Sequence, residues 1–373
     1  MIKIGGARRV RWGKRAGVAS GLVGMLSVLG ELCFLLPDLL VTRDALPFYK
    51  ENLAVFRGLL QATLLATFVL GAISILTLRS KAHGVIGIAL GVVALLLGGS
   101  EAQPVEVGRR AFSVGLDYLV LELLVLGLVF VPLERLFALR PQNIFRAGWQ
   151  TDLKHFFVSH AGVQLISFAA MLPAVVAFSW STKVGYQEAV AAQPLWLQFI
   201  EILFAVDFAA YWAHRAFHKI PLLWNFHAIH HSSREMDWLA GSRMHIVDVF
   251  VTRAVGFLPV FVLGFAPPAV YAYVAFVSFH AVFIHANIRW RFPVVRWLLT
   301  TPQYHHWHHT CDEEGIDKNF ASFLPVLDVA FGTAHQPDYW PKRYGTVRFQ
   351  PPESWLGQLA YPFRRHRDRT PYG

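Results

Sequence analysis

The chain has 373 residues, of which 55% are hydrophobic and 16% carry a charged side chain, and its mean hydropathy is +0.42. Soluble domains are typically about 25% charged, so this composition excludes an ordinary soluble protein and indicates a polytopic membrane protein. The formal net charge is +10, but the basic residues lie between apolar runs and at both ends of the chain. This distribution argues against nucleic-acid binding and is typical of positive charge that flanks membrane spans.

The N-terminal stretch MIKIGGARRVRWGKRAG is basic and precedes an apolar run over residues 17–41. A secretory signal peptide has the same order, but its apolar core is only about 7–15 residues long and ends in a cleavage site of small residues. We therefore predict that 17–41 is the first membrane span. The two cysteines, Cys33 and Cys311, make neither a disulfide framework nor a thiolate metal site.

Further apolar runs follow, each near the length of about 20 residues that a helix needs to cross a bilayer. They lie at residues 53–78, 84–99, 116–133, 156–180 and 195–213. A longer stretch, 247–288, is interrupted by GFAPPA at 264–269, and we interpret it as a helical hairpin. The predicted fold class is therefore all-α, a polytopic bundle of membrane helices.

Basic residues precede the first span and follow the even-numbered spans, for example Lys81, Arg135 and Arg215. Because positive charge favours the cytoplasmic side, we predict that the N-terminus and these connections lie in the cytoplasm. Segments 214–245 and 285–309 would then share the cytoplasmic face. This matters because both segments are rich in histidine.

Twelve of the 17 histidines lie between positions 214 and 309. His214 and His218, in HRAFH, are four residues apart and so lie on one face of a helix. The segments HAIHH at 227–231 and HHWHH at 305–309 share the pattern HxxHH, whose spacings of three and four also predict one helical face. His306 then points elsewhere, and we place it outside the metal site.

A further pair, His280 and His285, lies at the end of the predicted hairpin. Its spacing of five fits one face only with a local bulge or a helix end between the two residues. The three patterns and this pair give ten candidate metal ligands: His214, His218, His227, His230, His231, His280, His285, His305, His308 and His309. One metal ion takes about four to six ligands. Ten imidazoles exceed that number and suit two ions.

Imidazole is a ligand for zinc, copper, iron and nickel. A structural zinc site would be closed and would usually include thiolates, so the cluster favours a redox centre with positions open for oxygen. A histidine ligand usually donates its second N–H to a carboxylate or carbonyl. The candidate carboxylates are Asp207, Asp237, Asp312, Asp317 and Asp328. For His245, both such a supporting role and a purely structural role stay open.

Five segments follow one another over residues 207–333: DFAAYWAHRAFH, LWNFHAIHHSSREMDWLAGSRMH, HANIRW, TPQYHHWHH and DKNFASFLPVLDVAFGT. They resemble the fatty acid hydroxylase/sterol desaturase superfamily of integral membrane di-iron enzymes. RAGWQTDLKHFF at 146–157 resembles the segment that leads into the catalytic domain of that superfamily. The resemblance implies a helical membrane bundle under a cytoplasmic cap that holds two metal ions. It implies an N-terminal multi-span region (1–145), a catalytic domain (146–345) and a basic C-terminal tail (346–373).

The resemblance also implies a chemistry. Two iron ions would use O2 and two electrons to take hydrogen from an unactivated C–H bond of a lipid, giving an alcohol or an alkene. The ten candidate histidines correspond to the family's motifs, and no catalytic residue beyond these ligands is implied. The electrons would come from a separate donor of the cytochrome b5 or ferredoxin type. Sterols, fatty acyl chains, alkylglycerols and carotenoids are all substrates within the superfamily.

Two alternatives stay open. A membrane cytochrome with bis-histidine haems requires isolated histidines deep in facing helices, and a non-catalytic lipid-binding scaffold would keep the fold without the reaction. If the chain acts on a lipid, we expect four aromatic side chains along its channel. They are Trp212, Phe226, Trp238 and Phe283.

Overall fold

A computed structural model describes residues 3–42, 46–78, 81–101, 115–161, 163–183, 185–347 and 350–364. Within these ranges the backbone forms α-helices and short 3-10 helices, and it forms no strand beyond two isolated β-bridges. Six of the helices are long and apolar enough to cross a membrane. The chain is therefore a multi-pass integral membrane protein, and the predicted all-α fold class is confirmed.

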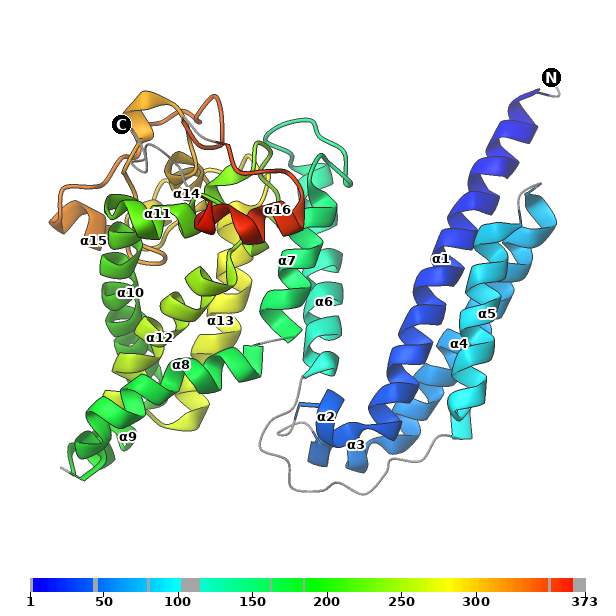
Figure 1. Cartoon of the computed structure of the whole chain (residues 1–373), viewed down its shortest axis with the longest axis horizontal. Coiled ribbons are helices and arrows are strands. Elements are labelled where there is room, and N and C mark those ends of the chain that lie inside the picture. The colour runs from blue at the N-terminus through cyan, green and yellow to red at the C-terminus, as the bar shows by residue number, and fades with distance from the viewer. Residues whose placement is uncertain are drawn as a thin grey trace. The chain divides into compact units, whose positions relative to one another are not determined.

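The chain forms two compact units, Met1–Val120 and Leu121–Gly373. Three long helices pack along one another in the N-terminal unit: α1 (Lys3–Leu35), α4 (Leu53–Thr77) and α5 (Ala82–Leu97) (Figure 1). Small residues line their contacts, because helices in lipid are held by close packing rather than by a hydrophobic effect. A Cβ at Gly87 would lie 2.0 Å from Ser20 Oγ, which itself donates to Thr67 O at 2.7 Å.

The first span ends earlier than its predicted limit at residue 41. α1 stops at Leu35 because Pro37 disfavours helical geometry at Leu36, whose φ and ψ are −128° and 51°. Two short helices follow, α2 (Pro37–Leu40) and α3 (Leu46–Glu51).

The C-terminal unit contains the remaining long helices. They are α6 (Leu116–Leu136), which begins just before the unit boundary, α7 (Trp149–Ala161), α8 (Val163–Phe178), α10 (Leu195–Lys219), α12 (Ile246–Leu263) and α13 (Pro267–His285), with a short α9 (Tyr186–Ala191). The prediction of one span over 156–180 is wrong, because this stretch is divided between α7 and α8, which run in different directions (Figure 1). Gly162, a poor helix former, stands between them in the sequence.

The helical hairpin predicted over residues 247–288 is confirmed as α12 and α13. α12 ends where Gly264 adopts a left-handed φ of 72°, a conformation that suits glycine at a helix C-terminus. Pro267 opens α13 at its first position, where no backbone N–H is needed. Both helices pack against α10.

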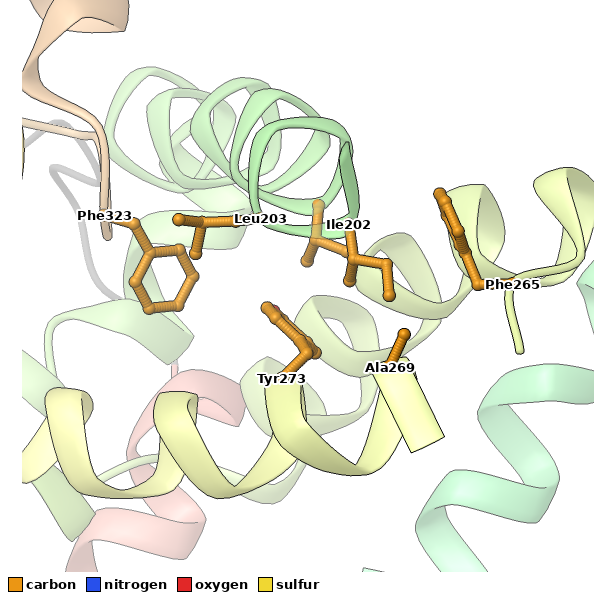
Figure 2. Packing of buried hydrophobic residues seen from close by; sticks show 7 residues of the cluster. Ile202, Leu203, Phe265, Ala269, Tyr273 and Phe323 are labelled. Carbon is orange, nitrogen blue, oxygen red and sulfur yellow. The ribbon is translucent and has the colours of Figure 1, made fainter. Parts of the chain in front are cut away.

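An apolar core lies between α10 and α13 (Figure 2). It includes Ile202, Leu203, Phe265, Ala269, Tyr273 and Phe323. Phe323 comes from a loop more than a hundred residues beyond α10, and its ring centroid lies 6.2 Å from that of Tyr273. This core therefore fixes the loop and the two histidine-bearing helices relative to one another.

Short helices form a cap over the ends of α10 and α13 (Figure 1). They are α11 (Pro221–His227), α14 (Pro302–His308), α15 (Pro325–Ala330) and α16 (Trp355–Ala360). α11 packs on α10, and α14 packs on α13. At the start of α14, Thr301 Oγ1 accepts the backbone N–H of Tyr304 at 3.3 Å, which caps the helix.

Candidate metal centre

Nine of the ten predicted histidines come together at the ends of helices, in two groups. α10 carries His214 and His218 near its end, and α11 and α13 end at His227 and His285. A 3-10 turn carries His230 and His231, α14 carries His305 and His308, and His309 caps α14. Because a helix ends at or beside each of these positions, side chains from five segments can converge.

We call the first set the five-histidine group. It contains His214, His218, His227, His231 and His308. One ring nitrogen of each lies within 4.8 Å of those of all the others. His214 Nε2 and His227 Nε2 are 3.0 Å apart.

The second set, the four-histidine group, contains His230, His285, His305 and His309. Its ligand nitrogens also lie within 4.8 Å of one another. His305 Nε2 is 3.0 Å from both His285 Nε2 and His309 Nε2. The two groups adjoin, because the rings of His231 and His309 stack with centroids 4.5 Å apart.

The second ring nitrogen of several histidines reveals which nitrogen carries the proton, because a carbonyl or carboxylate oxygen only accepts. His214 Nδ1 donates to Phe320 O at 2.8 Å, and His227 Nδ1 donates to Asp248 Oδ2 at 2.7 Å. In both rings Nε2 is then the nitrogen with the lone pair. These two lone pairs face each other at 3.0 Å, an arrangement that requires a proton or a metal ion between the two nitrogens.

The four-histidine group has the same arrangement. His230 Nδ1 donates to Arg243 O at 3.2 Å and His285 Nδ1 to Ala281 O at 2.6 Å, so two Nε2 lone pairs face each other at 3.4 Å. In the five-histidine group, His308 Nε2 is buried and has no hydrogen-bond partner among the residues that the structure describes. These orphaned nitrogens, with protons held on the outer side of the rings, fit metal ions bound by imidazole.

Burial and neighbouring imidazoles favour the neutral form of five of these rings. They hold the pKa of His230, His231, His305, His308 and His309 well below the ordinary histidine value. Neutral imidazole is the form that ligates metals, so the lone pairs are available without first losing a proton.

One loop, residues 317–320, provides acceptors for three rings of the five-histidine group. His218 Nδ1 lies 3.3 Å from Asp317 Oδ1, and His308 Nδ1 donates to Lys318 O at 2.9 Å. The third acceptor is the carbonyl of residue 320, which receives the His214 proton. A left-handed φ at Asp317 (56°) and at position 319 (59°) turns the loop so that these acceptors face the rings.

Two buried carboxylates hold this loop. Asp207 accepts the backbone N–H groups of residues 322, 323 and 324 at 2.6–3.1 Å. Asp328 accepts the backbone N–H groups of residues 320 and 321 at 2.8 Å, together with the hydroxyls of Tyr304 and Thr333. Both predicted carboxylates therefore support the histidines through the loop backbone and not by direct contact.

The other three predicted carboxylates have different partners. Asp317 contacts His218, whereas Asp237 pairs with Arg146 and Asp312 bonds the backbone of a later loop. The carboxylate that contacts His227 directly is Asp248, which the sequence reasoning missed. The available signal was an acidic side chain in the first turn of an apolar membrane helix, where a charge requires a partner.

His280 lies outside both groups. Its Nε2 is 3.1 Å from Thr300 O, and its ring stacks on Phe276 with centroids 5.2 Å apart. Its spacing of five from His285 explains this, because α13 continues without a bulge between the two residues.

His306 and His245 also lie outside the groups. His306 Nδ1 is 2.8 Å from Tyr344 Oη and its Nε2 is 3.3 Å from the carbonyl of His285, so it points away from the ligand nitrogens as its helical position predicts. His245 caps α12 by accepting the backbone N–H of Val247 at 3.1 Å. This contact favours the structural role for His245 over a supporting role at the metal site.

The four side chains expected along a channel lie in different surroundings. Trp212 packs on Phe331 with centroids 4.9 Å apart, and Phe226 packs on His245 at 5.0 Å. Trp238 lines a small pocket at the end of α6, and Phe283 lies near the His280 ring. The substrate channel stays a prediction.

Residues 199–333 match the model of the fatty acid hydroxylase family. This region, 135 of the 373 residues, is similar to a fatty acid hydroxylase domain. It contains all the ligand segments from α10 to the loop at 317–324, and the resemblance seen in the motifs is confirmed. No solved structure matches the chain.

The chain is also similar to parts of several curated proteins. The chain is 29% identical over 221 residues to "Ornithine lipid hydroxylase OlsE" of Rhizobium tropici, a match that covers 57% of the chain and 66% of the relative. It is 33% identical over 129 residues to "Alkylglycerol monooxygenase" of Homo sapiens, covering 34% of the chain and 28% of that protein. A "Very-long-chain aldehyde decarbonylase" of Oryza sativa subsp. indica is 31% identical over 178 residues, covering 44% and 26%. The matches thus span less than two thirds of these relatives.

Proposed function

We propose that this protein is a membrane-bound di-iron oxygenase that hydroxylates an unactivated C–H bond of a lipid, using O2 and two electrons. The observation that carries the proposal is the pair of adjoining groups of neutral, buried imidazoles, whose lone pairs converge on two centres. Two of the relatives are named for hydroxylation or mono-oxygenation of lipids, which favours hydroxylation over desaturation.

Nine histidines would hold the two ions. The five-histidine group would hold one, and the four-histidine group the other. His280 would not be a first ligand under this proposal, because its Nε2 faces the carbonyl of Thr300. When bound, iron supplies the activation of O2 and the oxidising power needed for C–H cleavage.

The protein's own groups orient the ligand rings and exclude water. The oxygen acceptors at Asp248, Arg243 and the 317–320 loop keep the ring protons on Nδ1, so each Nε2 stays directed inward. Burial of the ligand rings excludes bulk water, which protects a strong oxidant from side reactions. No other residue is proposed to act on the substrate directly.

The histidine groups lie at the ends of α10 and α13, helices suited to cross a membrane. A reacting carbon of a lipid could therefore reach the centre without leaving the bilayer, which suits a fatty acyl, sterol or alkylglycerol substrate. We propose that 146–345 is the catalytic domain, joined to the multi-span region 1–145 and the basic tail 346–373, of which residues 348–349 and 365–373 lie outside the described part.

Basic residues close to the histidine segments, for example Arg215, Lys219 and Arg289, support a cytoplasmic position for the site, where a separate electron donor of the cytochrome b5 or ferredoxin type would reach it. The same geometry argues against bis-histidine haem. A haem requires a flat cavity between two facing imidazoles, whereas these rings pack edge to face, for example His285 and His305 with centroids 4.3 Å apart.

The test combines metal analysis with lipid mass spectrometry. Purified protein is expected to contain about two irons per chain, and cells that express it should gain a lipid with one added oxygen. His230→Ala should abolish that product. A gain of an alkene in place of an alcohol would redirect the proposal to desaturation. A Soret band would support a cytochrome instead. Two irons with no change in any lipid would support a non-catalytic scaffold.

A further inference from the structure

Four buried charged side chains form a network beside the four-histidine group. Arg146 Nη2 lies 2.7 Å from Asp152 Oδ2 and 2.6 Å from Asp237 Oδ1. Arg243 Nε lies 2.5 Å from the other oxygen of Asp152. All four residues are at most 6% exposed, and their charges balance. Removing one member would leave a buried charge without its counter-charge, which proteins tolerate poorly.

The network reaches two ligands through the segment 237–243. The carbonyl of Arg243 accepts the Nδ1 proton of His230 at 3.2 Å, which directs His230 Nε2 inward. Asp237 Oδ1 also accepts the backbone N–H groups of residues 239 and 240, and so shapes the turn that follows. In that turn, a Cβ at Gly241 would lie 2.8 Å from His285 Nδ1, so the backbone there lies directly against the second ring.

Within the described residues, the ring protons of the two histidine groups go to different acceptors. The five-histidine group depends on the loop at 317–320, which Asp207 and Asp328 hold. The four-histidine group receives the Arg243 carbonyl, which the Asp152 network holds. Different carboxylates thus stabilise the two sets of ligands.

We propose that Arg146, Asp152, Asp237 and Arg243 are positioning residues for the metal ion of the four-histidine group. This inference rests on the proposed function in requiring two metal sites, but not on iron or on turnover. The network fixes the Arg243 carbonyl and the 239–241 turn, and through them the rings of His230 and His285. Loosening it weakens one metal site and spares the other.

Cobalt(II) loading of the full-length protein tests this without activity, because cobalt binds imidazole ligands and its visible spectrum reports their number and geometry. Wild type is expected to bind two cobalt ions per chain. Asp152→Asn should keep one ion at wild-type affinity and weaken the second by about 10–100-fold, the range found for outer contacts of metal ligands. Asp338→Asn is the matched control, because Asp338 pairs with Arg296 at the exposed surface and should leave both sites unchanged.

Ligand variants identify the affected site. In a His309→Ala background, which already lacks the four-histidine site, Asp152→Asn should cause no further loss of cobalt. In a His218→Ala background, which keeps the four-histidine site, it should weaken binding of the remaining cobalt ion by the same factor of about 10–100. Arg243→Lys keeps the charge and the carbonyl but loses the branched guanidinium contacts, and it should show the same selective loss if Asp152→Asn fails to fold.

The outcomes separate the two proposals. Fewer than two cobalt ions in wild type would overturn the dinuclear centre itself. Two ions in wild type, with both bound normally in Asp152→Asn and Arg243→Lys, would overturn only the positioning role. Equal weakening of both sites, with helical circular dichroism preserved, would also overturn it, because it would show general loosening of the cap.

Discussion

Replacing Asp248 with alanine should weaken one metal site by a defined amount. Asp248 Oδ2 accepts the Nδ1 proton of His227 at 2.7 Å, and both side chains are at most 5% exposed. A buried hydrogen bond to a charged group contributes about 1.5–3 kcal/mol. Loss of that contact should therefore lower metal affinity at the five-histidine group about 10–100-fold, a range equivalent to about 1.4–2.8 kcal/mol. Chelator competition followed by the spectrum of bound cobalt measures this affinity.

Two controls make the result specific. Asp248→Asn keeps an oxygen that can accept the His227 proton, so its loss of affinity should be the smaller of the two. Asp312→Ala removes a carboxylate that bonds the backbone of residues 342 and 343 and touches no histidine of either group, so it should leave both affinities unchanged. If Asp248→Ala binds both ions as wild type does, the reasoning that a buried carboxylate orients His227 is refuted.

Three further predictions follow from individual contacts. His308→Ala should lower the metal content, whereas His306→Ala should leave it unchanged, and equal losses by elemental analysis would contradict the separation of these neighbours. Asp328→Asn should lower the free energy of unfolding by about 3 kcal/mol or more. Each carboxylate oxygen of Asp328 accepts two hydrogen bonds, and an amide keeps only one of these two acceptor oxygens. An unchanged thermal midpoint would contradict this prediction. His155 and His245 bond residues of α16, and burial lowers the pKa of both side chains in the folded protein. The neutral rings therefore stabilise the folded state fully above about pH 6.5, the ordinary histidine pKa, and this stabilisation is lost as the pH falls through the lowered folded pKa values. Hydrogen exchange of α16 should accelerate on acidification, and a pH-independent rate would contradict this assignment.

Much of the membrane architecture could be predicted, because long apolar runs allow only one backbone solution in lipid. α4, α6, α10 and the pair α12 and α13 follow the predicted ranges closely. The errors fall where a local signal interrupts a run: Pro37 ends α1 early, and the predicted span over 156–180 is two helices. Hydropathy averages over such signals, so it locates a run better than it locates the helix ends.

The contacts that orient the ligands were harder to predict. Phe320 and Arg243 contribute backbone carbonyls, and a backbone acceptor leaves no mark on the residue type in a sequence. Asp207 and Asp328 were named, but as direct partners, whereas they act more than one hydrogen bond away. The sequence could identify the chemistry of the ligands but not the loops that hold them.

The HxxHH pattern has a different geometry from the single helical face that the spacing predicts. In HAIHH, His227 and His231 join the five-histidine group and His230 joins the four-histidine group. HHWHH shows the reverse assignment, because His305 and the histidine four positions later join the four-histidine group, while the middle member, His308, joins the other. In both copies, the first and last histidines, four positions apart, belong to one group. The histidine three positions after the first belongs to the other group.

Under the proposed function, this crossing would explain why the pattern suits two ions and not one. Helical order ends within or just after each motif, so neighbouring rings diverge into the two adjoining groups. The HRAFH pair of α10 completes the five-histidine group, whereas α13 adds only His285 to the other group because position 281, four residues earlier, is an alanine. The count of five and four is therefore set by sequence spacing, and α14, which carries ligands of both groups, fixes the separation between them.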